Sequence, residues 1–215
     1  MTDVEETVMI DWDGPADGGT FHSEDVETFD LQDDDLDASN FEAPAPAALP
    51  ASRQEVLDRV HDEILRHWRQ GDLLFEVFEL DAGGASRVTP ADALAALWDV
   101  AANGDMPAPI AGCSLAWLMR EGIWHEDVQQ FLDAIYYALT DAGFGEPGLD
   151  PDATIELVRE YADALFEDAE PDEVWLFGLD PGFSCWFAGA GCDMAWLFVN
   201  LRESRCGLLL ATDTD

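Results

Sequence analysis

Lysine is absent from this chain of 215 residues, and its nine basic side chains are all arginine. Against them stand 47 aspartates and glutamates, so the formal net charge at pH 7 is -38. Direct binding to nucleic acid or to an anionic membrane needs a basic surface, because cationic side chains must neutralise phosphate groups. Nine dispersed arginines do not supply such a surface. We therefore expect neither nucleic acid nor membrane among the direct partners.

Long apolar runs and targeting signals are also missing. The first fourteen residues, MTDVEETVMIDWDG, are acidic from the third residue onward and contain neither the basic nor the apolar region of a secretory signal peptide. No apolar run approaches the roughly 18 to 20 residues that a membrane-spanning helix requires. These absences predict a cytoplasmic protein that does not cross a membrane.

Cysteine is scarce, and its spacing excludes the common metal and redox motifs. None of the four cysteines forms a Cys-x-x-Cys pair, and no histidine stands near them at the spacing of a zinc ligand. Cys185 and Cys192 have no basic neighbours in sequence that would activate a thiolate. We expect buried, free thiols among the four positions, which are Cys113, Cys185, Cys192 and Cys206.

No motif specifies a reaction, a metal site or a cofactor. His61 and His67 are six residues apart, which on a helix separates their side chains by about 120°, so we expect two exposed positions rather than a metal-binding pair. Carboxylates near strand ends are able to hold Mg²⁺ or transfer protons, but a chain with 47 acidic residues places several there by chance. Four aspartates stand at such positions: Asp180, Asp193, Asp213 and Asp215. The sequence predicts no catalytic residue, metal or cofactor, and it favours a protein that is not an enzyme.

Acidic residues are spread over the whole chain, although they are densest at its beginning. Residues 1–52 hold fifteen of the 47 acidic residues and no arginine, and the remainder still carries a net charge of −23. Global acidity is typical of halophilic proteins, in which concentrated salt screens the repulsion between carboxylates. It is equally typical of a surface that attracts a basic partner. The sequence leaves both explanations open.

Residues 1–51 are expected to form an acidic, largely disordered tail that ends in a Pro/Ala linker. Apolar residues interrupt the acids, most clearly in FDLQDDDLDASNF (residues 29–41), which holds five aspartates. A tail that only interacts with water does not need apolar side chains. We therefore predict that the apolar side chains dock on a surface and that the aspartates guide the approach by electrostatic attraction. Whether they dock on a partner or on the protein's own fold stays open here. The predicted interaction residues are Trp12, Phe21, Phe29, Leu31, Asp33, Asp34, Asp35, Leu36, Asp37 and Phe41.

Helical periodicity begins at Ser52, a candidate N-cap, and Gly71 is a candidate stop. Further helices are expected over residues 91–102, 110–121, 125–142 and 152–168. Residues 73–80, LLFEVFEL, alternate as a strand does but also fit a helix that continues after a break.

After Pro171 the sequence changes to short apolar stretches separated by turn residues. EVWLFGLD, FSCWFAGAG, DMAWLFVN and CGLLLATD predict a meander of three to four antiparallel strands. We therefore expect an α+β fold with a single domain over residues 52–215, in which a helical N-terminal two-thirds precedes a small C-terminal antiparallel sheet. The sequence does not predict an oligomeric state.

These observations predict a non-enzymatic, acidic protein-binding module that engages a basic protein surface, of the inhibitor, immunity or nucleic-acid-mimic (DNA mimic) type. One alternative is a halophile-adapted cytoplasmic enzyme or housekeeping protein. Another is a component of a capsid or other assembly that uses the tail for docking.

Overall fold

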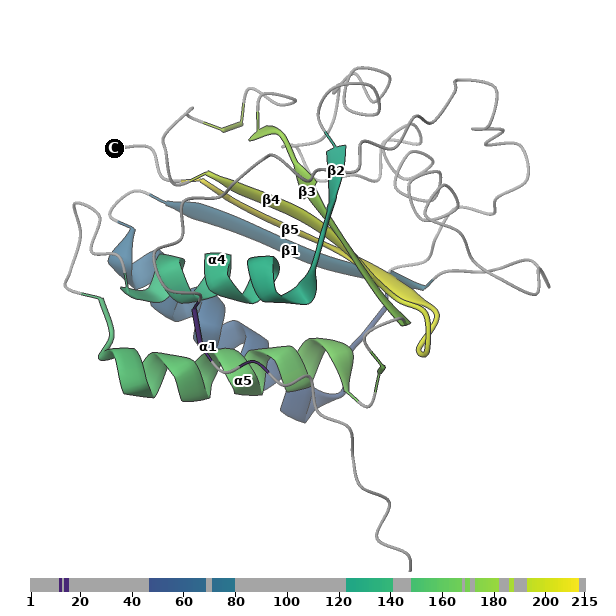
Figure 1. The fold of residues 1–215 in the computed structure, drawn as a ribbon, viewed down its shortest axis with the longest axis horizontal. Coiled ribbons are helices and arrows are strands. Elements are labelled where there is room, and N and C mark those ends of the chain that lie inside the picture. The colour runs from purple at the N-terminus through teal and green to yellow at the C-terminus, as the bar shows by residue number, and fades with distance from the viewer. Residues whose placement is uncertain are drawn as a thin grey trace, which may run out of the picture.

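In a computed structural model, the described residues form three helices packed on one face of a five-stranded sheet (Figure 1). The described residues are 12, 14–15, 47–68, 71–79, 123–140, 148–167, 169–170, 173–181, 186–187 and 193–212. In chain order they form α1 (Ala51–His67), β1 (Asp72–Glu79), β2 (Ile123–Glu126), α4 (Val128–Thr140), α5 (Pro151–Phe166), β3 (Val174–Leu179), β4 (Met194–Asn200) and β5 (Arg205–Thr212).

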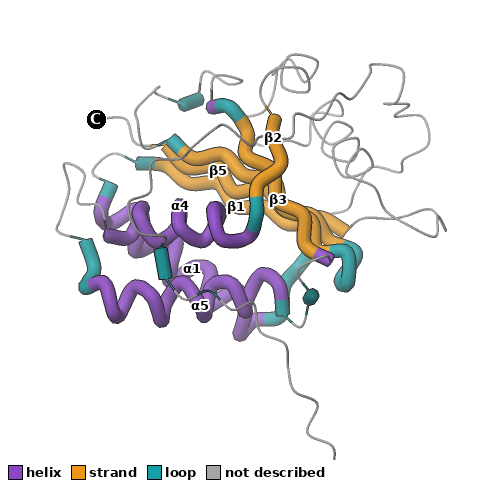
Figure 2. Tube along the Cα trace, in the orientation of Figure 1, coloured by secondary structure: helices purple, strands orange, loops and turns teal. Residues whose placement is uncertain are grey.

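The strands lie in the order β1-β5-β4-β3-β2, and every neighbouring pair is antiparallel. Figure 2 shows the strands together in one layer above the helices. β1 pairs with β5 over its whole length, from Asp72 opposite Thr212 to Glu79 opposite Arg205. At the other edge of the sheet β2 pairs with β3, and Ile123 stands opposite Leu179. The first and last strands in sequence are therefore neighbours in the sheet.

The expected α+β class is confirmed, but the predicted arrangement of three to four strands after a helical N-terminal two-thirds is wrong. The sheet has five strands, and two of them, β1 and β2, come from the part of the chain that was expected to be helical. β2 holds only four residues, IWHE, which is too short to show an alternating pattern. Residues 73–80 fitted both a strand and a helix, and pairing with β5 decides for the strand.

Helix α1 begins earlier than predicted. Ser52 is not its N-cap, because Pro50 stands at that position and no side chain caps the helix there. The Pro50 carbonyl accepts hydrogen bonds from the amides of Arg53 and Gln54, both at 3.0 Å, and these bonds close the first turn of the helix. The backbone becomes extended at Trp68, before the predicted stop at Gly71.

Helices α4 and α5 begin with polar caps. The Asp127 side chain accepts a hydrogen bond from the Gln130 amide at 2.7 Å, and the Gln130 side chain accepts one from the Asp127 amide at 2.9 Å. This reciprocal capping starts α4 at Val128, so His125 and Glu126 belong to β2 and not to the predicted helix. Asp150 caps α5, with Pro151 in the first helical position.

The remaining predicted elements have different outcomes. Within FSCWFAGAG, expected to be a strand, Trp186 and Phe187 lie in a turn and a bend, and the rest of the stretch is outside the described residues. The predicted helices over 91–102 and 110–121 are outside them as well. The other three predicted C-terminal stretches match β3, β4 and β5.

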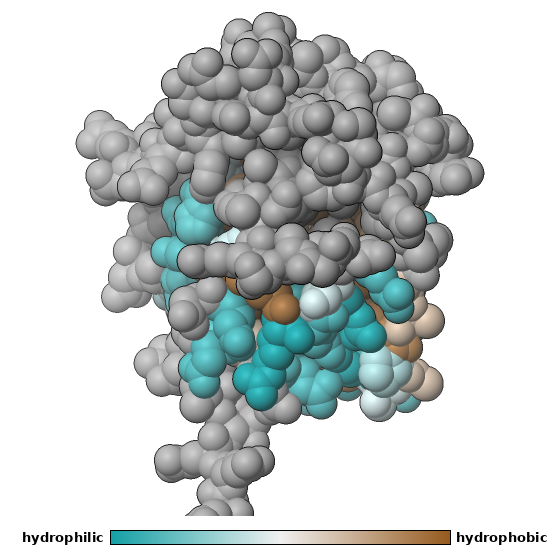
Figure 3. All heavy atoms as spheres, turned by 90° about the vertical axis from the view of Figure 1, so that its right-hand side faces the viewer, coloured by the Kyte–Doolittle hydropathy of each residue, from teal (hydrophilic) through white to brown (hydrophobic). Residues whose placement is uncertain are grey.

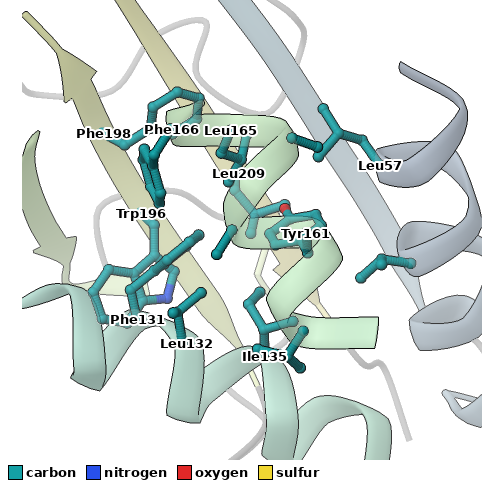
Figure 4. Close-up of a cluster of buried hydrophobic side chains, with 14 of the residues drawn as sticks. Leu57, Phe131, Leu132, Ile135, Tyr161, Leu165, Phe166, Trp196, Phe198 and Leu209 are labelled. Carbon is teal, nitrogen blue, oxygen red and sulfur yellow. The ribbon is translucent and has the colours of Figure 1, made fainter. Parts of the chain in front are cut away.

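The main core lies between the three helices and the sheet (Figure 4). Phe131 of α4 packs edge-on against Phe166 of α5 and Trp196 of β4, with ring centroids 6.1 and 5.3 Å apart. Phe198 of β4 makes a similar contact with Phe166 at 6.0 Å. Edge-to-face pairs of this kind add to the free energy gained by burying the rings.

Candidate functional site

Trp12 is the one predicted interaction residue within the described ranges, and it lies in the protein's own core. Its side chain is 2% exposed and contacts α4, where the ring centroid of Tyr136 is 6.0 Å away. The indole Nε1 donates a hydrogen bond to Oδ1 of the buried Asp133 at 3.0 Å. From α5, Nε of Arg159 donates to the Trp12 carbonyl at 2.9 Å. Trp12 therefore docks on its own fold.

Gly14 extends this contact along the chain. Its carbonyl accepts a hydrogen bond from Nε2 of Gln129 at 3.1 Å, and the same amide donates to Asp133 at 2.7 Å. Gly14 has a φ of 115°, which other residues rarely adopt, and a Cβ there would stand 3.4 Å from Cδ1 of Ile155. Trp12, Gly14 and the half-buried Pro15 are called the Trp12 anchor below.

The other nine predicted interaction residues lie outside the described residues, so their docking role stays a prediction. They are Phe21, Phe29, Leu31, Asp33, Asp34, Asp35, Leu36, Asp37 and Phe41. The predicted boundary between a tail (1–51) and a domain (52–215) also stays a prediction. Trp12, Ala47 and Leu49 nevertheless come from before that boundary and pack with the core.

Arg53 is a buried cation that the sequence analysis did not single out. Its side chain is 8% exposed and donates hydrogen bonds to the carbonyls of Ala164 and Leu165 in the last turn of α5. Such carbonyls have no partner inside the helix. The guanidinium also donates to Glu203 in the β4–β5 turn at 2.7 and 3.0 Å, and to Glu167 at 3.1 Å. Arg53 thereby connects α1, the end of α5 and the sheet.

Every arginine within the described ranges has an acceptor inside the protein. Besides Arg53, these contacts are Arg59 to Glu160, Arg66 to Glu63 at 2.7 Å, Arg159 to the Trp12 carbonyl, Arg202 to Glu173 at 3.7 Å and Arg205 to Glu203 at 3.2 Å. The positively charged side chains of this part of the chain are therefore already engaged by the protein's own acceptors.

The outer sides of α1 and α5 form an exposed acidic surface, called the acidic helix face below. Its members are Glu55, Asp58 and Asp62 of α1 together with Asp152, Glu156, Glu160 and Asp163 of α5. The Arg59–Glu160 ion pair joins the two helices across this face. An open depression of about 610 Å³ follows α1 and includes Glu55, Asp58 and Asp62 in its lining.

Figure 3 shows the end of the molecule at which α5 ends and the β4–β5 turn lies. The described residues on this side are mostly hydrophilic.

Asp163 on the acidic helix face and Glu203 in the β4–β5 turn have pKa values that shift in opposite directions. Partial burial raises the pKa of Asp163, and the nearby negative charge of Glu160 raises it further. Partial burial acts in the same direction on Glu203, but hydrogen bonds and positive charge from Arg53 and Arg205 outweigh it and lower the pKa of Glu203. The Asp163 carboxyl therefore lies beside another negative charge, whereas the Glu203 carboxyl lies beside two arginines.

The prediction that His61 and His67 are exposed is wrong, since they are 7% and 2% exposed. Nε2 of His61 is hydrogen-bonded to the Tyr161 hydroxyl at 3.0 Å, and burial lowers the pKa of His61 to about 4 against an opposing effect of Asp58. Burial also raises the pKa of Tyr161. Neither ring nitrogen of His67 has a hydrogen-bond partner among the described residues, and its Nε2 stands 3.9 Å from a Glu63 oxygen. The two histidines do not form a site together.

The described ranges hold no cluster of three or more His, Cys, Asp or Glu side chains that is suited to a metal ion. Of the four strand-end aspartates, Asp193 accepts a hydrogen bond from the Thr212 hydroxyl at 2.7 Å. Asp180 follows β3 directly, while Asp213 and Asp215 lie outside the described residues. Cys206 is a buried free thiol as expected, and burial raises its pKa to about 12. The other three cysteines are outside the described residues.

None of the described helices combines the length and the apolar character needed to cross a membrane. Comparison of the chain with protein-family models, with curated proteins and with solved structures gave no match.

Proposed function

We propose that the protein is a non-enzymatic, acidic module that binds a basic surface of another protein through the acidic helix face. The observation that carries this proposal is the difference in use between the two kinds of charge. The described arginines are engaged internally, whereas Glu55, Asp62, Asp152 and Glu156 are exposed carboxylates without an ion pair in the described part of the chain. Such a surface attracts cations over a distance of about a Debye length, roughly 8 Å at physiological salt.

The spacing of the carboxylates bears on the type of module. Asp152, Glu156, Glu160 and Asp163 lie within twelve residues of α5, and the eleven steps from the first to the last rise about 17 Å at 1.5 Å per residue. They supply about one negative charge per 4 Å, compared with one per roughly 1.7 Å along duplex DNA. One helix alone is therefore a sparse imitation of a phosphate backbone. We favour a module of the inhibitor or immunity type over a strict nucleic-acid mimic.

A halophile-adapted protein is the second candidate, and the observation that favours it is the charge of −23 on residues 53–215. In that case the carboxylates interact with solvent and salt rather than with a partner. The two candidates differ in a simple measurement. Thermal stability of a halophilic protein rises steeply as molar salt is added, whereas an acidic binding module folds well at low salt.

Affinity purification of the full-length protein at low and high salt tests the proposal. The chain must remain complete because Trp12 contributes to the core, so a truncation at Ser52 would confuse loss of binding with loss of packing. The acidic-face variant combines Glu55→Gln, Asp62→Asn and Glu156→Gln. A matched control removes the same charge from exposed positions elsewhere, with Asp72→Asn, Glu79→Gln and Glu170→Gln.

We expect the wild-type protein and the control to recover the same basic protein at low salt, and the acidic-face variant to recover much less of it. Equal recovery by all three proteins at both salt concentrations would show that the acidic helix face does not bind the partner. A third variant, in which Phe29, Leu31, Leu36 and Phe41 are all changed to serine, tests the predicted docking segment separately.

A further inference from the structure

The Trp12 anchor is held in the way in which proteins hold short peptides. One large side chain enters a desolvated site, and its indole N–H is paired with Asp133 at 3.0 Å. Two main-chain carbonyls, those of Trp12 and Gly14, accept hydrogen bonds from side chains of α5 and α4. Main-chain hydrogen bonds combined with a pocket for one side chain are typical of peptide recognition, and tryptophan is a frequent anchor in such contacts.

The surface beneath the anchor contains several polar groups. Asp133, Gln129 and Arg159 supply all the hydrogen bonds to the anchor that are described above. Water is able to replace the anchor at these polar groups, because each of them forms hydrogen bonds with solvent equally well. Phe131, Leu132 and Ile135, by contrast, are fully buried within the core.

The chain does not force the anchor into this position. Thirty-one residues, 16–46, separate it from Ala47, whose amide donates to the Val77 carbonyl of β1 at 2.8 Å. A segment of that length reaches at most about 100 Å when extended. Chain length alone therefore does not fix residues 12–15 on α4 and α5, and the hydrogen bonds with Asp133, Gln129 and Arg159 hold them there.

We propose that the surface of α4 and α5 around Asp133, Gln129 and Arg159 is a peptide-recognition groove, reversibly occupied by the chain's own Trp12, Gly14 and Pro15. The groove binds an indole, two main-chain carbonyls and a glycine with positive φ, and these features together describe a Trp-x-Gly-Pro peptide. The inference is independent of the proposed function, since it does not involve the acidic helix face. Release of the anchor leaves the groove open to a peptide of the same kind.

A competition experiment on the wild-type protein tests this inference. The full-length chain is labelled with ¹⁵N-tryptophan, and the Trp12 indole signal is assigned by its absence in a Trp12→Phe variant. An unlabelled peptide of residues 8–19 is then added. We expect it to displace the anchor and shift the Trp12 signal at peptide concentrations of about a millimolar, the usual effective concentration of a tethered segment. A peptide with alanine in place of tryptophan is the control and should leave the signal unchanged.

A second measurement uses the Trp12→Ala variant, whose groove has lost its internal occupant. We expect a fluorescent peptide of residues 8–19 to bind this variant at least tenfold more tightly than the wild-type protein, and a Gly14→Ala peptide to bind at least tenfold more weakly. If the variant does not fold, as judged by circular dichroism, the wild-type competition decides alone. A Trp12 signal that stays unchanged at about 5 mM peptide, well above the usual effective concentration, or equal affinity of a folded variant and the wild type, would overturn the inference.

Discussion

Replacing His61 with glutamine should remove the contribution of this buried imidazole to destabilisation by mild acid. The imidazole is buried between α1, α5 and β1, with the Tyr161 hydroxyl 3.0 Å from Nε2 and the ring centroid of Phe75 at 5.0 Å. Burial lowers the pKa of His61 to about 4, and the negative charge of Asp58 opposes this shift without cancelling it. Glutamine does not titrate and is able to keep a hydrogen bond to Tyr161.

The sign of the effect follows from the two pKa values of His61. In the unfolded chain the imidazole takes up a proton near its ordinary value of 6.5, whereas in the folded protein it stays neutral down to about pH 4. As the pH falls between these values, the unfolded state binds more protons and the folded state loses stability relative to it. A difference of about 2.5 pKa units corresponds to a loss of about 3 kcal/mol between pH 7 and pH 4.

Urea unfolding of the wild-type protein and of His61→Gln at pH 7, 5.5 and 4 measures this contribution. The many carboxylates titrate in both proteins, so their effect largely cancels when the free energies of unfolding are subtracted. We expect the stability of the wild type relative to the variant to fall by about 3 kcal/mol between pH 7 and pH 4. A difference that stays constant over this range would refute the assignment of His61 as a buried neutral group.

Three further predictions concern packing and reactivity. Arg53→Met should lower the free energy of unfolding by about 3–5 kcal/mol, because it leaves buried acceptors unpaired. The control Arg66→Met removes an exposed ion pair and should cost no more than about 1 kcal/mol. Equal losses of stability in urea unfolding would contradict the role of Arg53. Gly207→Ala should cost about 1–3 kcal/mol, since a Cβ there would overlap the ring of Phe198, and an unchanged urea midpoint would argue against this cross-strand contact. Burial raises the pKa of Cys206 to about 12, so this thiol should resist iodoacetamide at pH 8 in the folded protein and react in urea. Mass spectrometry distinguishes the labelled from the unlabelled protein. Labelling of the folded protein would show that the thiol is accessible.

Local sequence signals predicted the helices α1, α4 and α5, because each buries a periodic apolar face. They also predicted the strands β3 to β5, because each is a short apolar stretch bounded by turn residues and is buried along nearly its whole length. The same periodicity contained information about the polar residues of α1. Arg53 and His61 are in phase with Leu57, Val60 and Ile64, so a helical projection places them on the buried side. They were missed because charged and polar side chains are normally exposed. Their partners come from α5, which the pattern of α1 alone does not identify.

Other features depend on contacts that no local pattern contains. β2 is recognisable only through its pairing with β3, since four residues carry too little periodicity. Trp12 was one of the predicted interaction residues, but its acceptor Asp133 lies 121 residues away in the sequence, and no local pattern connects the two. The acidic helix face depends on α1 lying beside α5 and on the arginines having acceptors within the protein, and neither property is contained in a local sequence pattern.

The salt dependence of partner binding tests the central claim most directly. The dissociation constant of the protein recovered by affinity purification is measured from low to high salt for the wild type, the acidic-face variant and the matched control. We predict that affinity falls steeply with salt for the wild type and the control, and that the slope is clearly reduced for the acidic-face variant. Identical slopes for all three proteins would contradict the claim that the acidic helix face binds a basic partner.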